Sequence, residues 1–422
     1  MLNKFSAFLR DRRLTAEDFP LEQERETFLA ELACGLRGQE SSLAMIPAFL
    51  PAHTDFCGSG RVAVLDAGGT NLRVGAVDFL DGRPQRVQFE KYPLPGTDRA
   101  LAKQDFFDAV AEKLLPWLEG AEKIGFCFSY AAECMENGDA RIKDFCKEVK
   151  VTGARGAQVC RELKDAIARQ GLERDFACVQ LNDTVAAMLG AMADFGTEAY
   201  SAFLGVILGT GFNSCYGEKT ENILKYTGAA YGHKTMVVNM ETGSYTGFRG
   251  GVIDRRVDES SALPGDHLTE KMLSGAYLGK VLFAAMEDAK KEGFYTSDLS
   301  FLRGELPLWE ANAFLAGEKS VLDVLAREEQ TLTRTLITAL YGRSARILAV
   351  LLTAVSLHLE AGTEKPVAVA MEGSTYEKSP LLRELLQEEL ALVKEKYGIA
   401  FKLLSAENAT LKGAALAAVS AK

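Results

Sequence analysis

Apolar residues recur along the chain with two different periods, which predict helices in some segments and strands in others. In residues 22–37 the apolar positions, among them Phe28 and Leu32, have helical spacing, and the segment ends near two glycines as a helix does. An extended stretch is expected at 45–53. The chain therefore begins with a helix that leads into extended structure.

Two segments share the plan of a strand, a glycine-rich tip and a second strand. Residues 61–79 (RVAVLDAGGTNLRVGAVDF) give two β-rich runs around Gly-Gly-Thr, and residues 202–217 (AFLGVILGTGFNSCYG) repeat the plan around Gly-Thr-Gly. This weak internal repeat has too long a period for a solenoid, and it indicates two related lobes that each open with a glycine-tipped hairpin.

The other segments alternate between helix and strand, which predicts an α/β protein. Between the hairpins we expect a helix over 101–119, a strand at 123–130, a helix over 157–170, a strand at 176–181 and a helix after Asn182. The second half is richer in helix, with long amphipathic stretches at 266–292, 319–341 and 344–361, a buried strand at 366–372, a helix over 379–396, a strand at 400–404 and a terminal helix over 409–421.

Composition indicates a soluble globular protein of two or three domains, with 422 residues, 47% apolar and 25% charged. The formal charge of −10 would repel nucleic acid and anionic membranes, so we expect neither as a partner. A polyanionic ligand would have to be held locally by backbone N–H groups, a few cations and a metal.

Eight scattered cysteines form no Cys-x-x-Cys pair and no zinc-type cluster, so free thiols are expected. The amino-terminal residues lack an apolar core of signal-peptide length, and no stretch approaches the ~20 apolar residues of a membrane span. We therefore expect a cytoplasmic protein.

The two glycine tips are candidate phosphate loops. Gly68, Gly69 and Thr70 let backbone N–H groups approach an anion closely, although such hairpins often only turn the chain. Pairing with the tip Gly209-Thr210-Gly211 strengthens the phosphate interpretation, because two facing tips can grip a triphosphate from both sides. Asp66, at the end of the first strand, could hold Mg²⁺ through water, or could be an ordinary turn aspartate.

Asn182 and Asp183 lie where an apolar strand gives way to a helix, at the carboxyl edge of the predicted sheet. Phosphoryl transfer to an alcohol needs one carboxylate that accepts the hydroxyl proton, and Asp183 suits this role. Asn-Asp-Thr is also good helix-capping chemistry, so a purely structural role stays open.

Eight motifs in the same order resemble those of the hexokinase family. LDAGGTNLRVGAV and LGTGFNSCY resemble its two phosphate motifs, IGFCFSYAAE its sugar-binding segment, and LNDTVAAML the segment with its catalytic aspartate. VVNMETG, the segment from Arg255 to Gly279, VAMEGSTYEKSP and SAENATLKGAAL resemble its sugar glutamate, adenosine and closing phosphate motifs. The resemblance runs from about residue 28 to the end of the sequence.

The resemblance implies a role for each matching residue. Asp183 would be the general base, beside sugar ligands Ser129, Lys143, Asn182, Asn213, Glu241 and Glu270. The phosphates and magnesium of the nucleotide would be handled by Asp66, Gly68, Gly69, Thr70, Asn71, Arg73, Gly209, Thr210 and Gly211, with Gly373, Ser374, Thr410 and Lys412 on the nucleotide side.

Three departures from the family pattern bear on the sugar rather than on the reaction. Ala131 replaces a proline that would stiffen the sugar loop, and Ile142 replaces a threonine. Lys147 or Lys150 could therefore substitute for Lys143. Near the carboxyl end, Ala-Thr-Leu at 409–411 replaces Gly-Ser-Gly, which keeps a hydroxyl group but loses flexibility.

The implied fold is the two-lobed actin-like ATPase (ribonuclease H-like) architecture, an α/β fold with a cleft between the lobes. The small lobe would take 60–204 plus 405–422, and the large lobe 1–59 plus 205–404. The implied activity is ATP-dependent phosphorylation of the 6-hydroxyl of glucose, with mannose or fructose as other acceptors. The alternatives are a non-catalytic sugar sensor and an actin-like chaperone or filament ATPase, and the protein could be a monomer or a homodimer.

Overall fold

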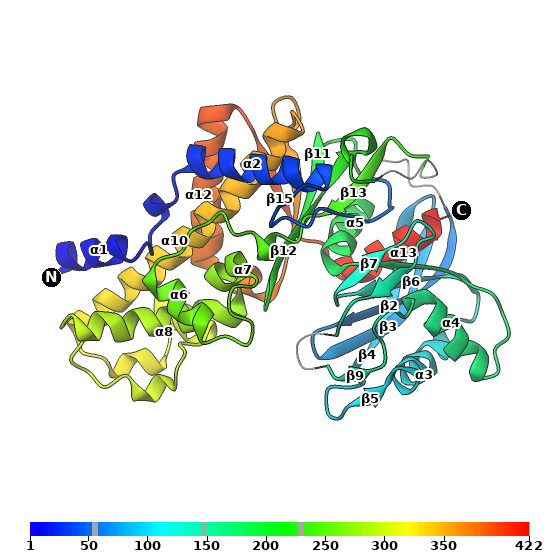
Figure 1. Cartoon of the computed structure of the whole chain (residues 1–422), viewed down its shortest axis with the longest axis horizontal. Coiled ribbons are helices and arrows are strands. Elements are labelled where there is room, and N and C mark those ends of the chain that lie inside the picture. Colours follow the sequence, from blue (N-terminus) through cyan, green and yellow to red (C-terminus); the bar gives the residue numbers. More distant parts are fainter. Residues whose placement is uncertain (53–57, 146–148, 227–231, 422) are drawn as a thin grey trace.

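The computed structural model describes residues 1–52, 58–145, 149–226 and 232–421, and its strands form two main sheets (Figure 1). One sheet has five strands in the order β10-β6-β2-β3-β4. Its strands are β2 (Gly60–Gly68), β3 (Asn71–Leu80), β4 (Arg83–Pro93), β6 (Ala121–Phe128) and β10 (Ala177–Leu181). Two small two-stranded sheets join β5 (Leu101–Ala102) to β9 (Val151–Thr152) and β7 (Ala132–Cys134) to β8 (Ala140–Ile142).

The second main sheet has six strands in the order β1-β13-β12-β11-β14-β15. Its strands are β1 (Ile46–Pro47), β11 (Ala202–Leu208), β12 (Phe212–Lys219), β13 (Thr235–Asn239), β14 (Val367–Glu372) and β15 (Phe401–Leu404). The extended stretch expected at 45–53 supplies only the two residues of β1 to this sheet.

Both predicted glycine-tipped hairpins are present, and each occupies an equivalent place in its sheet. The strands β2 and β3 pair antiparallel, while β2 also pairs parallel with β6. In the same way β11 pairs antiparallel with β12 and parallel with β14. The sequence repeat thus corresponds to two sheets that are built alike.

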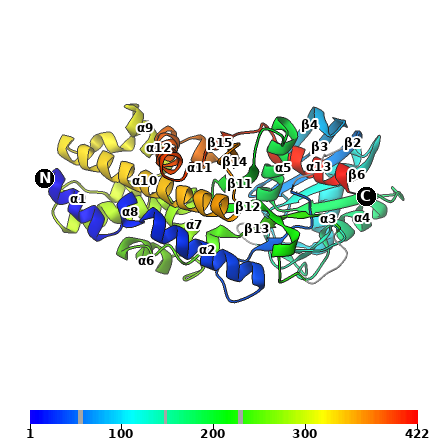
Figure 2. The same ribbon diagram turned by 90° about the horizontal axis from the view of Figure 1, so that it is seen from above.

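Helices cover the sheets and extend the molecule away from the five-stranded sheet. Figure 2 shows α1, α10 and α12 toward one end and the five-stranded sheet with α3 and α4 toward the other. The α-helices are α1 (Leu2–Asp11), α2 (Leu21–Arg37), α3 (Lys103–Leu114), α4 (Val159–Arg169), α5 (Asp183–Phe195), α6 (Val252–Glu259), α7 (Leu268–Leu273), α8 (Gly275–Lys291), α9 (Leu308–Ala316), α10 (Arg327–His358), α11 (Ser374–Glu377), α12 (Pro380–Tyr397) and α13 (Ala409–Ser420). Short 3-10 turns are η1 (Ala16–Asp18), η2 (Leu115–Trp117), η3 (Thr220–Asn222), η4 (Thr242–Ser244), η5 (Ser300–Leu302) and η6 (Val321–Val324).

Two helical predictions in the second half differ from the structure. The stretch 266–292 is broken at Ser274 into α7 and α8, because the amides that would continue the helix donate elsewhere. The stretches at 319–341 and 344–361 were predicted as separate helices, whereas 327–358 form the single helix α10. A glycine inside a helix costs only about 1 kcal/mol, and burial of the surrounding residues outweighs Gly342.

The helix α10 is the core of its half of the molecule. Among the described residues it is the only helix long and apolar enough to cross a membrane, and most of that apolar window is buried inside the protein. The six cysteines that the structure describes are free thiols, as expected.

The helices α5 and α13 pack against each other and connect the two sheets. The helix α13 contacts β2 and β6 of the five-stranded sheet, and α5 contacts β11, β12 and β14 of the other. Their apolar residues belong to one core that also contains Val64 from β2 and Phe203 from β11. The division into 60–204 plus 405–422 and 1–59 plus 205–404 stays a prediction.

A glycine on α13 allows this close helix packing. A Cβ at Gly413 would lie 1.8 Å from the carbonyl oxygen of Ala186 on α5, so any side chain must push the helices apart. We expect Gly413→Ala to lower the free energy of unfolding by about 1–3 kcal/mol, the usual cost of overpacking, as measured by urea denaturation.

The matched control is Gly342→Ala in α10, where a Cβ would meet no atom within 4 Å. This change should raise the free energy of unfolding by about 0.5–1 kcal/mol through helix propensity. Equal stability of the two variants would contradict the packing argument.

Candidate functional site

Four neighbouring strands place two predicted phosphate ligands in one row with the end of the strand that precedes Asp183. In the registers of the five-stranded sheet, Arg73 on β3 lies opposite Asp66 on β2, Asp66 opposite Cys127 on β6, and Cys127 opposite Leu181 on β10. The strands β2, β6 and β10 are parallel, so their carboxyl ends share one edge. Leu181, the last residue of β10, lies two strand spacings or about 10 Å from Asp66. Asp183 comes two residues later, after Asn182, and therefore lies at that edge.

The buried Cys127 thiol between these strands feels both carboxylates. Its pKa is raised well above the ordinary value, first by burial and then by the negative charges of Asp66 and Asp183. Both aspartates therefore lie close enough for their charges to act on this sulfur. No motif in the sequence singles out Cys127.

Asp66 is held by two residues that were also predicted as phosphate ligands. Its Oδ2 accepts hydrogen bonds from Arg73 Nε at 3.1 Å and from Thr410 Oγ1 at 2.8 Å. Arg73 Nη2 donates to Thr410 Oγ1 at 2.6 Å, which closes the triangle. Thr410 comes from the first turn of α13, so the end of the chain is joined to the first phosphate loop.

Asp183 begins α5, and the capping chemistry that the sequence left open is present around it. Asn182 Oδ1 accepts from the Thr184 amide at 2.9 Å. Asp183 Oδ1 accepts from the same amide at 2.8 Å and from Thr184 Oγ1 at 3.3 Å. Within the described part of the chain, hydrogen bonds reach only Oδ1 of Asp183, so Oδ2 can take a further proton donor.

The first glycine tip is exposed and is supported from the sugar-binding segment. Ser129, whose predicted role is sugar binding, lies against this tip, since a Cβ at Gly68 would be 3.0 Å from its Oγ. The Tyr130 hydroxyl donates to the Gly69 carbonyl at 3.1 Å. Thr70 at the tip is exposed and Asn71 is half-buried, which leaves their polar groups accessible.

The second glycine tip is anchored through its carbonyl groups. Gly209 O accepts from the Gly275 amide at 2.8 Å and from Thr375 Oγ1 at 2.8 Å, and Thr210 O accepts from the Ala276 amide at 3.2 Å. Residues 373 and 374 lie next to the tip, with Gly373 Cα 3.5 Å from the Cβ position of Gly209. The adenosine motif and the second phosphate motif are therefore neighbours.

The predicted sugar glutamates converge on the start of β12. Glu270 Oε2 accepts from the Phe212 amide at 2.9 Å. Glu241 Oε1 accepts from Asn239 Nδ2 at 2.7 Å, and Asn213 Nδ2 donates to Asn239 Oδ1 at 3.0 Å. A Cβ at position 211 would lie 2.8 Å from Glu270 Oε2, which explains the glycine at that position.

Asn239 is a site residue that the sequence reasoning missed. It is buried at the end of β13 and links Asn213 to Glu241 through its amide group. The one local signal was that Asn239 precedes Glu241 by only two residues in VVNMETG.

Glu241 is strained and poorly solvated. Its φ of 57° lies in the left-handed region, which costs free energy for a non-glycine residue and recurs at functional sites. Burial raises the pKa of the Glu241 carboxyl, and the charges of Asp183 and Glu270 raise it further. Asp183 is therefore close enough to Glu241 for its charge to act on that carboxyl group.

The predicted lysines are less well placed. Lys143 is exposed. Burial, followed by the charge of Glu241, raises the pKa of Cys134 to about 11, and the charge of Lys143 opposes this rise. Lys412 pairs with Asp194 at 2.6 Å, eleven residues or about 16 Å along α5 from Asp183. Lys150 is exposed, and Lys147 lies outside the described residues. The roles of these lysines stay predictions.

The donor set near Asp66 fits a magnesium ion only with ligands from outside the chain. No group of three or more His, Cys, Asp and Glu side chains suited to a metal occurs in the described ranges. Magnesium commonly binds one or two carboxylates together with waters and substrate phosphates, and dehydrates reluctantly. Because Arg73 and Thr410 occupy Oδ2 of Asp66, a water-mediated contact suits this carboxylate.

The chain is similar to known proteins along most of its length. A family model described as hexokinase matches residues 6–193, and a second model of the same description matches residues 203–420. The hexokinase of Brugia malayi is 28% identical over 90% of this chain and 71% of its own length. Human hexokinase-3 is 29% identical over 91% of this chain, which spans 44% of that relative's length.

A solved structure shares the fold over nearly the whole chain. The structure of the hexokinase from Schistosoma mansoni complexed with glucose superposes with a TM-score of 0.79 and 22% identity, over 99% of this chain and 98% of that one. The predicted actin-like ATPase fold is thereby confirmed. Since the second family model alone matches more than half of the residues, the chain belongs to the hexokinase family.

Proposed function

We propose that this protein transfers the terminal phosphoryl group of ATP to the 6-hydroxyl of glucose or a closely related hexose, with Mg²⁺ as cofactor. The observation that carries the proposal is the place of Asp183, at the sheet edge shared with Asp66 and close enough to Glu241 to raise its pKa. A carboxylate between a phosphate loop and a cluster of polyol acceptors has the neighbours that a kinase base requires.

The two carboxylate oxygens of Asp183 have different roles. Oδ1 is held by the Thr184 amide and hydroxyl, which fixes the carboxylate plane at the first turn of α5. Oδ2 accepts the proton of the sugar hydroxyl while that oxygen attacks the phosphorus, and so orients the nucleophile. A magnesium ion, when bound, neutralises phosphate charge, and Asp66 would hold it through water.

The two tips and Arg73 supply the remaining positive potential. At the two tips, backbone N–H groups can approach phosphate oxygens without interference from bulky side chains, apart from the Gly209 amide, which donates to the Gly211 carbonyl. Arg73 lies beside Asp66, and its fork-shaped guanidinium matches phosphate geometry. The net charge of −10 makes such local donors necessary, because the general field of the protein repels the nucleotide.

Sugar recognition rests on the linked amides and carboxylates of the large sheet. Asn213, Glu241 and Glu270 offer acceptors and a donor from one small region at the start of β12. A sugar that lacks one hydroxyl would leave a buried partner without a hydrogen bond, which disfavours that sugar strongly. The hexokinase structure from Schistosoma mansoni is a complex with glucose, which supports glucose as the acceptor.

Replacing Asp183 by Asn should abolish most catalysis and spare sugar binding. We expect kcat to fall by ~10²–10⁴-fold, the usual contribution of a general base, in an assay that couples hexose phosphate formation to NADP⁺ reduction. Glucose affinity, measured by calorimetry, should change little, because Asn keeps the shape and the Oδ1 acceptor.

The matched control is Asp194→Asn at the other end of α5, where the carboxylate pairs with Lys412. This variant should keep its activity. Wild-type turnover in Asp183→Asn would refute the assignment of the base, and a wild-type protein that binds sugar but phosphorylates none would favour the non-catalytic sensor.

Glu241→Gln should stabilise the sugar-free protein near neutral pH. Because the pKa of Glu241 is raised in the folded state, ionisation of this carboxyl group lowers the free energy of unfolding at pH values above its ordinary pKa of 4.5. A neutral amide removes that cost, so thermal unfolding should occur at a higher temperature in the variant, and the gain should vanish as the pH falls below 4.5.

Glu329→Gln is the control of opposite sign. Burial would raise the Glu329 pKa, but hydrogen bonds from Thr296 and Ser297 outweigh it and lower the pKa to about 2. The charged Glu329 therefore stabilises the fold above the ordinary pKa of 4.5, and this stabilisation is lost as the pH falls toward 2. This variant should unfold at a lower temperature near neutral pH. The same sign of shift in both variants would contradict the account.

A further inference from the structure

Arg343 is a fully buried arginine that no part of the proposed chemistry uses. It lies in the middle of α10 with no exposed surface and is the largest fully buried side chain among the described residues. Arginine is rarely buried without specific partners, because removing its charge from water is costly.

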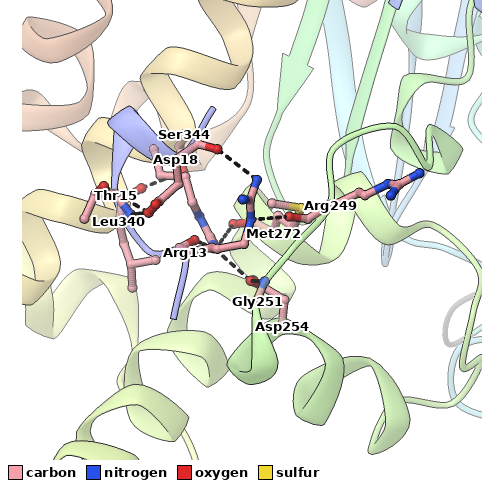
Figure 3. Close-up of polar contacts among 10 residues, drawn as sticks. Arg13, Thr15, Asp18, Arg249, Gly251, Asp254, Met272, Leu340 and Ser344 are labelled. Carbon is pink, nitrogen blue, oxygen red and sulfur yellow. Dashed lines mark hydrogen bonds and ion pairs between the residues drawn. The ribbon is translucent and has the colours of Figure 1, made fainter. Parts of the chain in front are cut away.

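The guanidinium group of Arg343 joins three segments that are far apart in the sequence. Nη1 donates to Asp254 Oδ2 at 2.9 Å and to the Arg13 carbonyl at 3.2 Å, and Nη2 donates to the Met272 carbonyl at 3.0 Å. Figure 3 shows Arg13, Asp254 and Met272 close to one another. Asp254 Oδ2 also accepts from the Gly251 amide at 2.8 Å, which caps α6.

The bond to Met272 replaces one that a continuous helix would have made. In an unbroken helix the Ala276 amide would donate to the Met272 carbonyl, four residues earlier. Here Ala276 donates to the Thr210 carbonyl and Gly275 to the Gly209 carbonyl, so the junction of α7 and α8 gives its amides to the second glycine tip. Arg343 supplies the donor that the Met272 carbonyl has lost.

The short helix α7 carries Glu270, whose carboxylate accepts from the Phe212 amide beside the same tip. Other buried groups fix its sides: Thr269 Oγ1 donates to the Tyr245 carbonyl, and Lys271 Nζ to Asp258 Oδ1, each at 2.6 Å. Arg343 alone among these contacts the end of α7 that faces the break.

We propose that Arg343 is a positioning residue for the sugar site, which holds the α7–α8 junction so that Glu270 stays in register with the 209–211 tip. The inference rests on the proposed function. Since Glu270 would contact sugar before and during transfer, its misplacement should weaken glucose binding and leave the chemical step nearly unchanged.

A role in stability alone would predict that variants of Arg343 unfold more easily but keep the wild-type glucose KM. Buried ion pairs are often no more stable than apolar packing. In the described part of the structure, Arg343 Nε and Asp254 Oδ1 have no hydrogen-bond partner. What distinguishes Arg343 is the direction of its donors: Nη1 serves Asp254 and Arg13 while Nη2 serves Met272, whereas a lysine carries its three donors on a single nitrogen.

The test compares Arg343→Lys with Arg346→Lys, one turn along α10. Arg346 is matched because it also pairs with a carboxylate, Glu389, at 2.7 Å and donates to a carbonyl of the amino-terminal segment, Phe19 O, at 3.3 Å. Among the described residues, its side-chain hydrogen bonds do not reach α7. For Arg343→Lys we expect a glucose KM raised about tenfold, the loss of one charge-assisted hydrogen bond, with kcat nearly unchanged. Arg346→Lys should keep the wild-type glucose KM.

A double variant, Arg343→Met with Asp254→Asn, removes the pair without leaving a buried charge alone. It should recover thermal stability relative to Arg343→Met and still show the raised glucose KM, because the Met272 carbonyl lacks its donor. A wild-type glucose KM in Arg343→Lys and in the double variant would overturn the inference while the kinase proposal stands. A wild-type protein that phosphorylates no hexose would instead refute the proposed function.

Discussion

The register between four strands of one sheet is the constraint on which the rest of the site depends. It brings Arg73, Asp66, Cys127 and Leu181 into one row and so fixes Asp183 at a set spacing from the first phosphate loop. A slip of one residue in β10 would turn its side chains to the other face of the sheet and move Asp183 away from that edge. The geometry of base and phosphate loop is therefore a property of backbone pairing.

The second half of the site is held by a helix that stops early. The break between α7 and α8 frees two amides for the 209–211 tip and leaves a carbonyl that Arg343 satisfies. The α7–α8 junction thus links Glu270 and the 209–211 tip to Arg343, which is buried in the middle of α10. The helices α5 and α13 connect this half to the five-stranded sheet through a shared apolar core.

The sequence predicted the hairpins and the order of helices and strands because apolar periodicity and glycine tips are local signals. It missed the break at Ser274, which depends on acceptors at Gly209 and Thr210 more than sixty residues away. It also divided α10, because Gly342 resembles a helix end unless the burial of Arg343 and Ser344 is known. Asn239 was missed for a similar reason, since its importance lies in linking Asn213 on β12 to Glu241, which comes after the end of β13.

Motif resemblance named more candidate site residues than spacing did. It brought forward Thr410, which the structure places on Asp66, yet it also brought forward Lys412, whose ammonium pairs with Asp194. Two residues on one helix face different neighbours, and a linear motif does not record which face each occupies.

The central claim is that Asp183 meets the sugar hydroxyl that becomes phosphorylated. A crystal structure of the protein with bound glucose tests this most directly. The account predicts the 6-hydroxyl within about 2.6–3.2 Å of Asp183 Oδ2, with Glu241 and Glu270 on other hydroxyls. Glucose bound elsewhere, or in this region with its 6-hydroxyl turned away from Asp183, would contradict it.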